Sequence, residues 1–117
     1  MPHMLLIHEP IDQRQERGVA AGKAVYAQMT RFTSELQARG LLIASSSLAG
    51  ADDAVRVQVR DGRHQVLDGP FAEAKEMVGG FFLLNCETRE EALAIAAECP
   101  AAAWCTVEVR RSGPCYE

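Results

Sequence analysis

Charged side chains are concentrated at one short turn of this sequence. Asp68 precedes Gly69-Pro70, and Glu73, Lys75 and Glu76 follow closely. Glycine permits a tight backbone turn and proline fixes it, so the turn can hold a charged group in one position, as a binding or catalytic site requires. Asp68 could act as a carboxylate base or a substrate anchor, or it could accept hydrogen bonds from the backbone of its own turn. Glu73 and Lys75 could bind a ligand, or they could simply face solvent.

A second group of charges lies in the segment 104–110. Apolar and polar residues alternate there, which is typical of a strand, so Glu108 and Arg110 lie on the same face. The two side chains could approach Lys75 or Glu73 across the sheet. A guanidinium can bind a carboxylate or a phosphate through two parallel hydrogen bonds. Such a cluster could hold a small organic anion, or it could be a structural network of ion pairs.

His8 is the histidine best placed for acid–base chemistry. It ends the apolar segment 4–8, which is predicted to be a buried strand; alternatively, it is a residue at the edge of the core. His3 and His8 are an odd number of positions apart and point to opposite faces of a regular strand. The sequence contains no spacing typical of zinc ligands and no glycine-rich loop that leads from a strand into a helix. We therefore expect no metal ion and no cofactor.

The composition is that of an ordinary globular protein. The chain has 117 residues, of which 48% are hydrophobic, and this suits one domain with a real core. Its 12 basic and 16 acidic residues form no basic stripe, so nucleic acid is not expected as a direct partner. The first residues resemble neither a signal peptide nor a membrane span, which predicts a cytoplasmic protein.

The cysteines fit a reducing compartment. Cys86, Cys99, Cys105 and Cys115 have no Cys-x-x-Cys spacing and do not form the dense framework of a small secreted domain. Free thiols are expected, although Cys99 and Cys105 flank a turn and could come close enough to pair.

The order of the predicted elements indicates the fold. Strands are predicted at residues 4–8, 41–48, 55–60, 64–67, 81–84 and 104–110, helices at 19–39 and 88–99, and a short helical segment at 72–78. Residues 12–18 are expected to be a loop or a frayed helix start, Gly40 should end the first long helix, and Thr88 with Glu91 forms a capping box for the second. Asp61-Gly62 is typical of a hairpin turn, and the alternation of residues 55–60 predicts a strand with one solvated face. Without the hairpin insertion at 54–67, the order is strand, helix, strand, strand, helix, strand, as in an α+β ferredoxin-like βαββαβ fold. We expect a single domain over residues 1–111 and a polar C-terminal tail over residues 112–117.

The predicted central strands are apolar on both faces. In this topology the first and third strands, residues 4–7 and 81–84, lie in the middle of the sheet. Two helices can cover only one face. Exposing about four large apolar side chains on the other face would forfeit ~6–12 kcal/mol, which is comparable to the whole net stability of a typical domain, about 5–15 kcal/mol. The sequence therefore predicts a homodimer in which two sheets pack face to face.

The charged turn also belongs to a recognisable pattern. Residues 68–76, followed by Gly79-Gly80, Glu91-Ala92, Pro100 and residues 107–110, resemble the DGPF signature of the YCII-related proteins. The resemblance covers residues 41–110 well and the first 40 residues in pattern only. It implies the dimeric α+β barrel architecture, in agreement with the homodimer predicted above.

The resemblance also implies candidate functions. Enzyme-like YCII-related proteins carry a His–Asp pair thought to perform acid–base chemistry, and their histidine falls near Tyr26 to Met29, where this chain has none. Tyr26 could replace it as a hydrogen-bond donor, although an unperturbed phenol titrates near pH ~10 and is a poor base at neutral pH. The expected protein is a cofactor-independent small-molecule binding protein or enzyme, with acid–base or hydrolytic chemistry. Its candidate catalytic residues are Asp68, His8 and Tyr26, and its candidate ligand-binding residues are Glu73, Lys75, Glu108 and Arg110.

A second function remains open. DGPF proteins are often encoded beside, or fused to, extracytoplasmic-function sigma factors. The chain could therefore be a regulatory or scaffolding dimer without catalytic turnover, associated with such a sigma factor.

Overall fold

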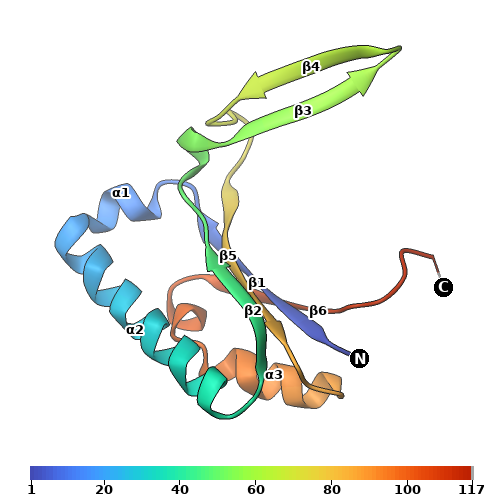
Figure 1. Ribbon diagram of the computed structural model, residues 1–117. Coiled ribbons are helices and arrows are strands. Elements are labelled where there is room, and N and C mark those ends of the chain that lie inside the picture. Colours follow the sequence, from blue (N-terminus) through green and yellow to red (C-terminus); the bar gives the residue numbers. More distant parts are fainter. Residues whose placement is uncertain (117) are drawn as a thin grey trace.

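The structure, a computed structural model, describes residues 1–116 of the chain. Its main sheet has four antiparallel strands in the order β2-β5-β1-β6 (Figure 1). These strands are β1 (His3–Pro10), β2 (Leu42–Ser47), β5 (Glu76–Leu84) and β6 (Thr106–Arg111). The two predicted central strands are indeed central, and the α+β ferredoxin-like fold is confirmed.

The strand register separates the two faces of this sheet. Leu5 lies opposite Phe82 and Val109. Leu5 and Phe82 belong to the hydrophobic core, and the partly buried Val109 packs against it. The next residue, Leu6, points to the other face with its partners Phe81 and Glu108. Directly opposed residues on antiparallel strands share a face, so one face of the sheet is core and the other carries both apolar and charged side chains.

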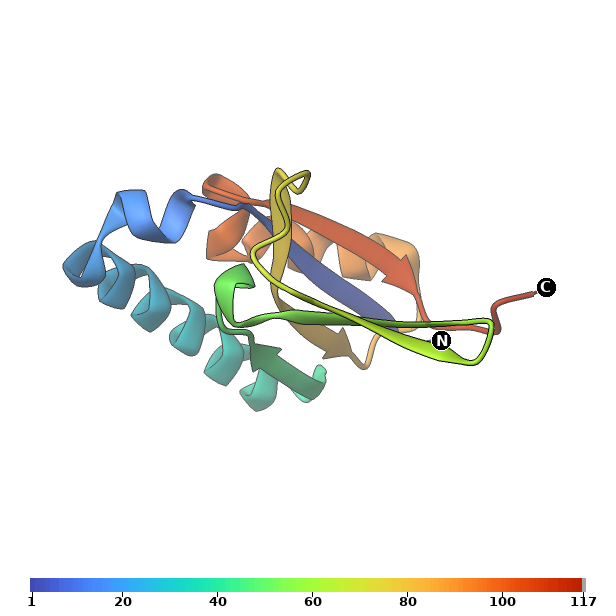
Figure 2. The same cartoon turned by 90° about the horizontal axis from the view of Figure 1, so that it is seen from above.

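The helices cover only the core face. Helices α2 (Val19–Ala38) and α3 (Arg89–Glu98) lie on the same side of the sheet (Figures 1 and 2). From α2, the side chains of Phe32 and Leu36 are buried, and the Phe32 ring meets Phe82 edge to face at 5.3 Å between centroids. The sequence between Asp12 and Gly18, predicted as a loop or a frayed helix start, forms the short helix α1 (Gln13–Arg17).

Local signals explain where the long helices begin and end. Gly40 has a φ of 70°, the left-handed conformation expected of a glycine that ends a helix. At α3 the Thr88 side chain accepts a hydrogen bond from the Glu91 backbone N–H, as the predicted capping box requires. After Pro100, the chain makes a short 3₁₀ turn, Pro100–Ala103, before it enters β6.

A β-hairpin projects from one end of the sheet. Strands β3 (Val55–Arg60) and β4 (Arg63–Asp68) pair only with each other and form a separate two-stranded sheet. Asp61 and Gly62 both have positive φ, so the predicted Asp-Gly turn is confirmed. Every residue of both strands is exposed, whereas the alternation of residues 55–60 predicted that β3 would have only one solvated face.

The predicted short helix at residues 72–78 is absent. A tight turn, in which the Ala74 N–H donates to the Phe71 carbonyl, leads directly into β5 at Glu76. Glu76 pairs with Pro10, and the Ile11 N–H donates to the Lys75 carbonyl at 3.0 Å. So few residues cannot form a stable helix alone, and the backbone hydrogen bonds with β1 favour an extended strand instead.

The other face of the sheet has no helix over it. Met4, Leu6, Phe81 and Leu83 point to this open face and are only half-buried. Throughout residues 1–116, no helix is both long enough and apolar enough to cross a membrane.

Candidate functional site

A cavity of about 960 Å³ lies between α2 and the core face of the sheet. The side chains that line its apolar part come from β1, α2, β5 and the turn before β6. They are Ile7, Val25, Met29, Phe82 and Trp104. Its polar lining includes Glu9, Arg14, Arg17, Tyr26, Thr30, Thr33 and residues 45–47. The volume and this mixture of surfaces are typical of a site for a small organic molecule.

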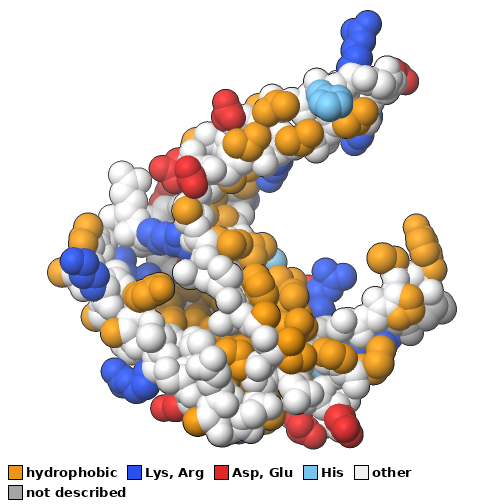
Figure 3. All heavy atoms as spheres, in the orientation of Figure 1, with side chains coloured by type: hydrophobic (Ala, Val, Ile, Leu, Met, Phe, Trp, Pro, Cys, Tyr) orange, Lys and Arg blue, Asp and Glu red, His pale blue; other side chains and the backbone are white. Residues whose placement is uncertain are grey.

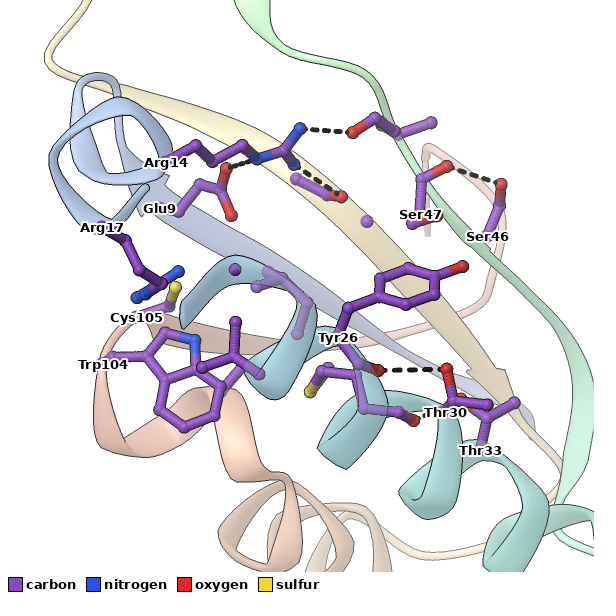
Figure 4. Close-up of a pocket in the computed structure, with 18 of the residues that line it drawn as sticks. Glu9, Arg14, Arg17, Tyr26, Thr30, Thr33, Ser46, Ser47, Trp104 and Cys105 are labelled. Atoms are coloured by element: carbon purple, nitrogen blue, oxygen red, sulfur yellow. Dashed lines mark hydrogen bonds and ion pairs between the residues drawn. The ribbon is translucent and has the colours of Figure 1, made fainter. Parts of the chain in front are cut away.

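Glu9 and Arg14 form an ion pair inside this cavity (Figure 4). Glu9 is buried, with 8% of its surface exposed, because it follows Leu5 and Ile7 at the inward positions of β1. The Arg14 guanidinium, from α1, also donates hydrogen bonds to the carbonyls of Leu48, at 2.8 Å, and Gly79, at 3.4 Å. Arg14 thus compensates the buried carboxylate and connects three segments of the fold.

Gly79 lies directly beside this ion pair. A Cβ atom there would lie 2.6 Å from Glu9 Oε2 and 3.0 Å from an Arg14 nitrogen. Glycine therefore allows the strand to pass close to the two charged groups.

Arg17 has a different environment. Its guanidinium lies over the Trp104 ring, 5.6 Å from the centroid (Figure 4). No ion pair with a carboxylate is observed for Arg17 within residues 1–116. The cavity therefore presents a cation whose charge is not neutralised by a neighbouring acid.

Tyr26 is the predicted catalytic residue that lines this cavity. Its ring extends from α2 toward β2 and the serines of residues 45–47 (Figure 4). The side chain is 60% exposed. The hydroxyl is therefore accessible and can donate a hydrogen bond to a bound molecule.

Cys105 is not an activated nucleophile. Burial raises the pKa of its thiol to about 11, and the negative charge of Glu9 contributes to this increase. Its Sγ donates a hydrogen bond to Gln13 Oε1 at 3.3 Å. A thiol with this pKa is protonated at neutral pH. All four cysteines are free, so Cys99 and Cys105 do not pair.

His8 and Glu108 come together on the open face, away from this cavity. His8 Nε2 donates to Glu108 Oε1 at 2.6 Å, and both side chains are partly exposed. Arg110 Nε lies 3.9 Å from the other oxygen of Glu108. His8 also lines a second, smaller depression of about 580 Å³ beside Phe71. The predicted cluster of Glu108 and Arg110 with Lys75 or Glu73 is replaced by this contact with His8.

The charged turn forms the base of the hairpin. The Glu73 carboxylate accepts a hydrogen bond from Arg56 Nη1 at 3.0 Å, and the Arg56 guanidinium stacks on the Phe71 ring, 3.6 Å from its centroid. A hydrogen bond with its own backbone, followed by the bond from Arg56, lowers the pKa of Glu73. Asp68 is the exposed last residue of β4, and Lys75 is exposed just before β5. Neither of them lines either cavity.

Sequence reasoning missed Glu9, Arg14, Arg17 and Trp104. One signal for Glu9 was available: in an alternating strand it shares a face with Leu5 and Ile7. Because the strand was predicted to be apolar on both faces, the alternation was not used to assign Glu9 to the core face. Within residues 1–116, no group of three or more His, Cys, Asp or Glu residues is arranged to hold a metal ion.

The chain matches a known protein family over most of its length. The model of the YCII-related domain matches residues 1–112, and the chain belongs to this family. An uncharacterised protein from Rhizobium meliloti (strain 1021) is 49% identical over 37 residues. The aligned part is 32% of this chain and 30% of that protein. The likeness to this relative is therefore local.

Proposed function

We propose that the cavity between α2 and the sheet binds a small organic acid with an apolar body. Arg17, which lies over Trp104 and has no ion pair with a carboxylate within residues 1–116, is the observation that carries this proposal. A guanidinium on an aromatic ring can still hold a carboxylate or phosphate at its edge. Ile7, Val25 and Met29 would then contact the apolar part of the molecule.

Acid–base chemistry without a cofactor is the reaction that this lining supports best. Glu9 is a buried carboxylate on the cavity wall, where it can exchange a proton with a bound molecule. Tyr26, which lines the same cavity from α2, can donate a hydrogen bond to that molecule. Cys105 is excluded as the nucleophile by the raised pKa of its thiol. The protein acts as a binding protein if Glu9 only balances Arg14, and as an enzyme if it also transfers a proton.

The functional unit that we propose is a homodimer of the DGPF subfamily, located in the cytoplasm. The half-buried apolar side chains of the open face, with Leu6 and Leu83 at its centre, support sheet-to-sheet packing. The motif at residues 68–71 supports the subfamily, and the free thiols support the compartment. The alternative, a regulatory or scaffolding dimer associated with a sigma factor, is favoured by the lack of a histidine near Tyr26.

A thermal-shift screen tests the ligand proposal. Small organic acids, lactones and sugar phosphates would be added to the parent protein and to Arg17→Ala. A ligand that binds only the folded state at a hundred times its dissociation constant stabilises it by about 2.7 kcal/mol, which raises the melting temperature by several degrees. Loss of a charged hydrogen-bond partner should weaken anion binding by about 10- to 100-fold.

Arg31→Ala is the matched control for this screen. Arg31 is an exposed arginine of α2 that does not line the cavity, so its removal changes the net charge by the same amount. Equal shifts for the parent, Arg17→Ala and Arg31→Ala would show that the anion site lies elsewhere.

A further inference from the structure

One face of the projecting hairpin is rich in valine and uncovered. The register pairs Val57 with Val66, and Val55 and Val59 point to the same side of β3. Their partners on β4, Asp68 and His64, lie at the two ends of this face. These four valines are exposed by 54% (Val55), 62% (Val57), 53% (Val59) and 63% (Val66). We call this set the valine face. The opposite side carries Arg56, Gln58 and Arg60 from β3, and β4 adds Arg63, Gln65 and the exposed Leu67. This side is therefore mainly polar, and the hairpin is amphipathic although both its sides are exposed.

The base of the hairpin is braced rather than loose. The Gly69 N–H donates to the Ala54 carbonyl at 2.7 Å. A Cβ atom on Gly69 would lie 2.1 Å from the Ala51 carbonyl oxygen, so two backbone segments touch there. Arg56 connects β3 to the turn through the Phe71 ring and the Glu73 carboxylate. The charged turn therefore fixes the direction in which the hairpin projects.

The hairpin projects over the open side of the sheet. Figures 1 and 2 both show it extending away from α2, and Figure 3 shows the hollow between the hairpin and the sheet, with apolar side chains on both. The radius of gyration is 16.0 Å, whereas a compact chain of this length has about 13 Å. A protomer of this shape is not a closed globule.

The exposed area points to a second copy of the chain. The accessible surface is 8012 Å², whereas a monomeric protein of this mass exposes about 6,300 Å². The excess is roughly twice the 800 Å² that each partner buries in an interface of standard size. In a twofold dimer, the same surface of each protomer is buried by the other protomer. One partner can therefore cover both the valine face and the open sheet face.

We infer that the β3–β4 hairpin is a dimerisation arm, whose valine face packs against the second copy and continues the sheet-to-sheet contact. This inference rests on the homodimer proposed above. It gives the charged turn a role, because Arg56, Phe71 and Glu73 hold the arm in the direction that the partner requires. Each protomer contributes its own arm to the contact with the other protomer.

The test compares two substitutions on neighbouring residues of β3. Val57→Asp puts a carboxylate on the valine face, and Gln58→Asp puts the same group on the polar face. The dimer dissociation constant would be measured by light scattering on a dilution series. Val57→Asp should raise this constant at least about 100-fold, because each dimer then buries two unpaired carboxylates. Gln58→Asp should change it less than about threefold. Equal effects of the two substitutions would overturn the inference.

Hydrogen exchange of the parent protein tests the arm without any substitution. The backbone amides of residues 55–68 should exchange more slowly above the dimer dissociation constant than below it. If the parent is a dimer and these amides exchange equally at all concentrations, the inferred role of the hairpin in dimerisation is wrong, whereas the proposed homodimer is not contradicted. If the parent is a monomer at every concentration, both the homodimer and the arm are wrong.

Discussion

At the scale of single residues, the two arginines of the cavity differ in what surrounds them. Arg14 contacts a buried carboxylate and two backbone carbonyls, so its hydrogen-bonding capacity serves the fold. Arg17 contacts an aromatic ring, which leaves the edge of its guanidinium available to an anion. The same residue type thus has a structural role at one position and a proposed binding role at the other.

The Glu9–Arg14 pair is expected to stabilise the fold. Glu9→Gln leaves the partly exposed Arg14 without its charged partner at a site where the acid is buried, and it should lower the free energy of unfolding by about 1–3 kcal/mol. Urea unfolding of the parent and the variant measures this difference. The control is Glu98→Gln, which breaks the exposed Glu98–Arg39 pair and should cost at most about 0.5 kcal/mol. Equal losses in the two variants would contradict a special role for the cavity pair.

Cys105 should show a distinctive pH dependence. In a Cys115→Ser background, Cys105 is the cysteine that iodoacetamide can reach, because Cys86 and Cys99 are buried. Only the thiolate reacts, so the alkylation rate should rise up to about pH 11 rather than level off near the ordinary thiol pKa. Glu9→Gln removes a negative charge that raises this pKa, and it should therefore increase the rate at pH 8.5. A rate that levels off below pH 9 would contradict the burial of this thiol.

The sequence predicted individual residues less well than it predicted elements. It singled out Asp68, Glu73 and Lys75 because they are charged and close in sequence, yet the structure has them at the base of the hairpin and outside both cavities. Glu9 and Arg17 come from separate segments whose approach depends on how α1 folds over the sheet. Local sequence cannot reveal such long-range placement. Tyr26 was proposed from the family resemblance rather than from local sequence, and it lines the cavity from α2.

At the scale of elements, the helix ends and the hairpin turn were predicted correctly. The Thr88–Glu91 cap, the glycine at position 40 and the Asp61-Gly62 turn each depend on a few adjacent residues. The prediction of a short helix at residues 72–78 was wrong, because the conformation of this segment depends on pairing with β1. Here tertiary hydrogen bonds overrode a weak helical tendency.

Two glycine substitutions should have opposite effects on stability. Gly69→Ala places a Cβ atom against the Ala51 carbonyl oxygen, a backbone atom that cannot move aside cheaply, and should lower the free energy of unfolding by about 2 kcal/mol or more. Gly22→Ala lies within α2 with nothing within 4 Å of the new Cβ, and it should raise this free energy by about 0.5–1 kcal/mol. Chemical denaturation of both variants provides the comparison. A Gly69→Ala protein as stable as the parent would show that the base of the hairpin is not tightly packed.

At the scale of the whole molecule, the protomer is an open structure. Helices cover one side of the sheet, and a braced hairpin projects over the other side (Figure 1). The sequence anticipated the uncovered face from two strands that are apolar on both sides. It did not indicate that the hairpin would stand apart from the body, because an amphipathic strand pair looks the same whether it packs on its own chain or on another.

The assembly should be a dimer in solution. Light scattering at micromolar concentration should give twice the chain mass of 12.8 kDa. Leu83→Asp, on the open face, should shift the protein toward the monomer, because a buried unpaired carboxylate opposes the sheet-to-sheet contact. A parent protein that remains at 12.8 kDa would contradict the proposed assembly.

The central functional claim is that the cavity binds a small organic acid, and the tryptophan in its lining provides the most direct test. Trp104 is the only tryptophan of the chain, and it lines the cavity beneath Arg17. Titration with an organic acid that raises the melting temperature should change the Trp104 fluorescence to saturation, with a dissociation constant that agrees with the thermal shift. Arg17→Ala should raise this dissociation constant about 10-fold or more. An acid that stabilises the protein but leaves the Trp104 fluorescence unchanged would contradict the claim that it binds in this cavity.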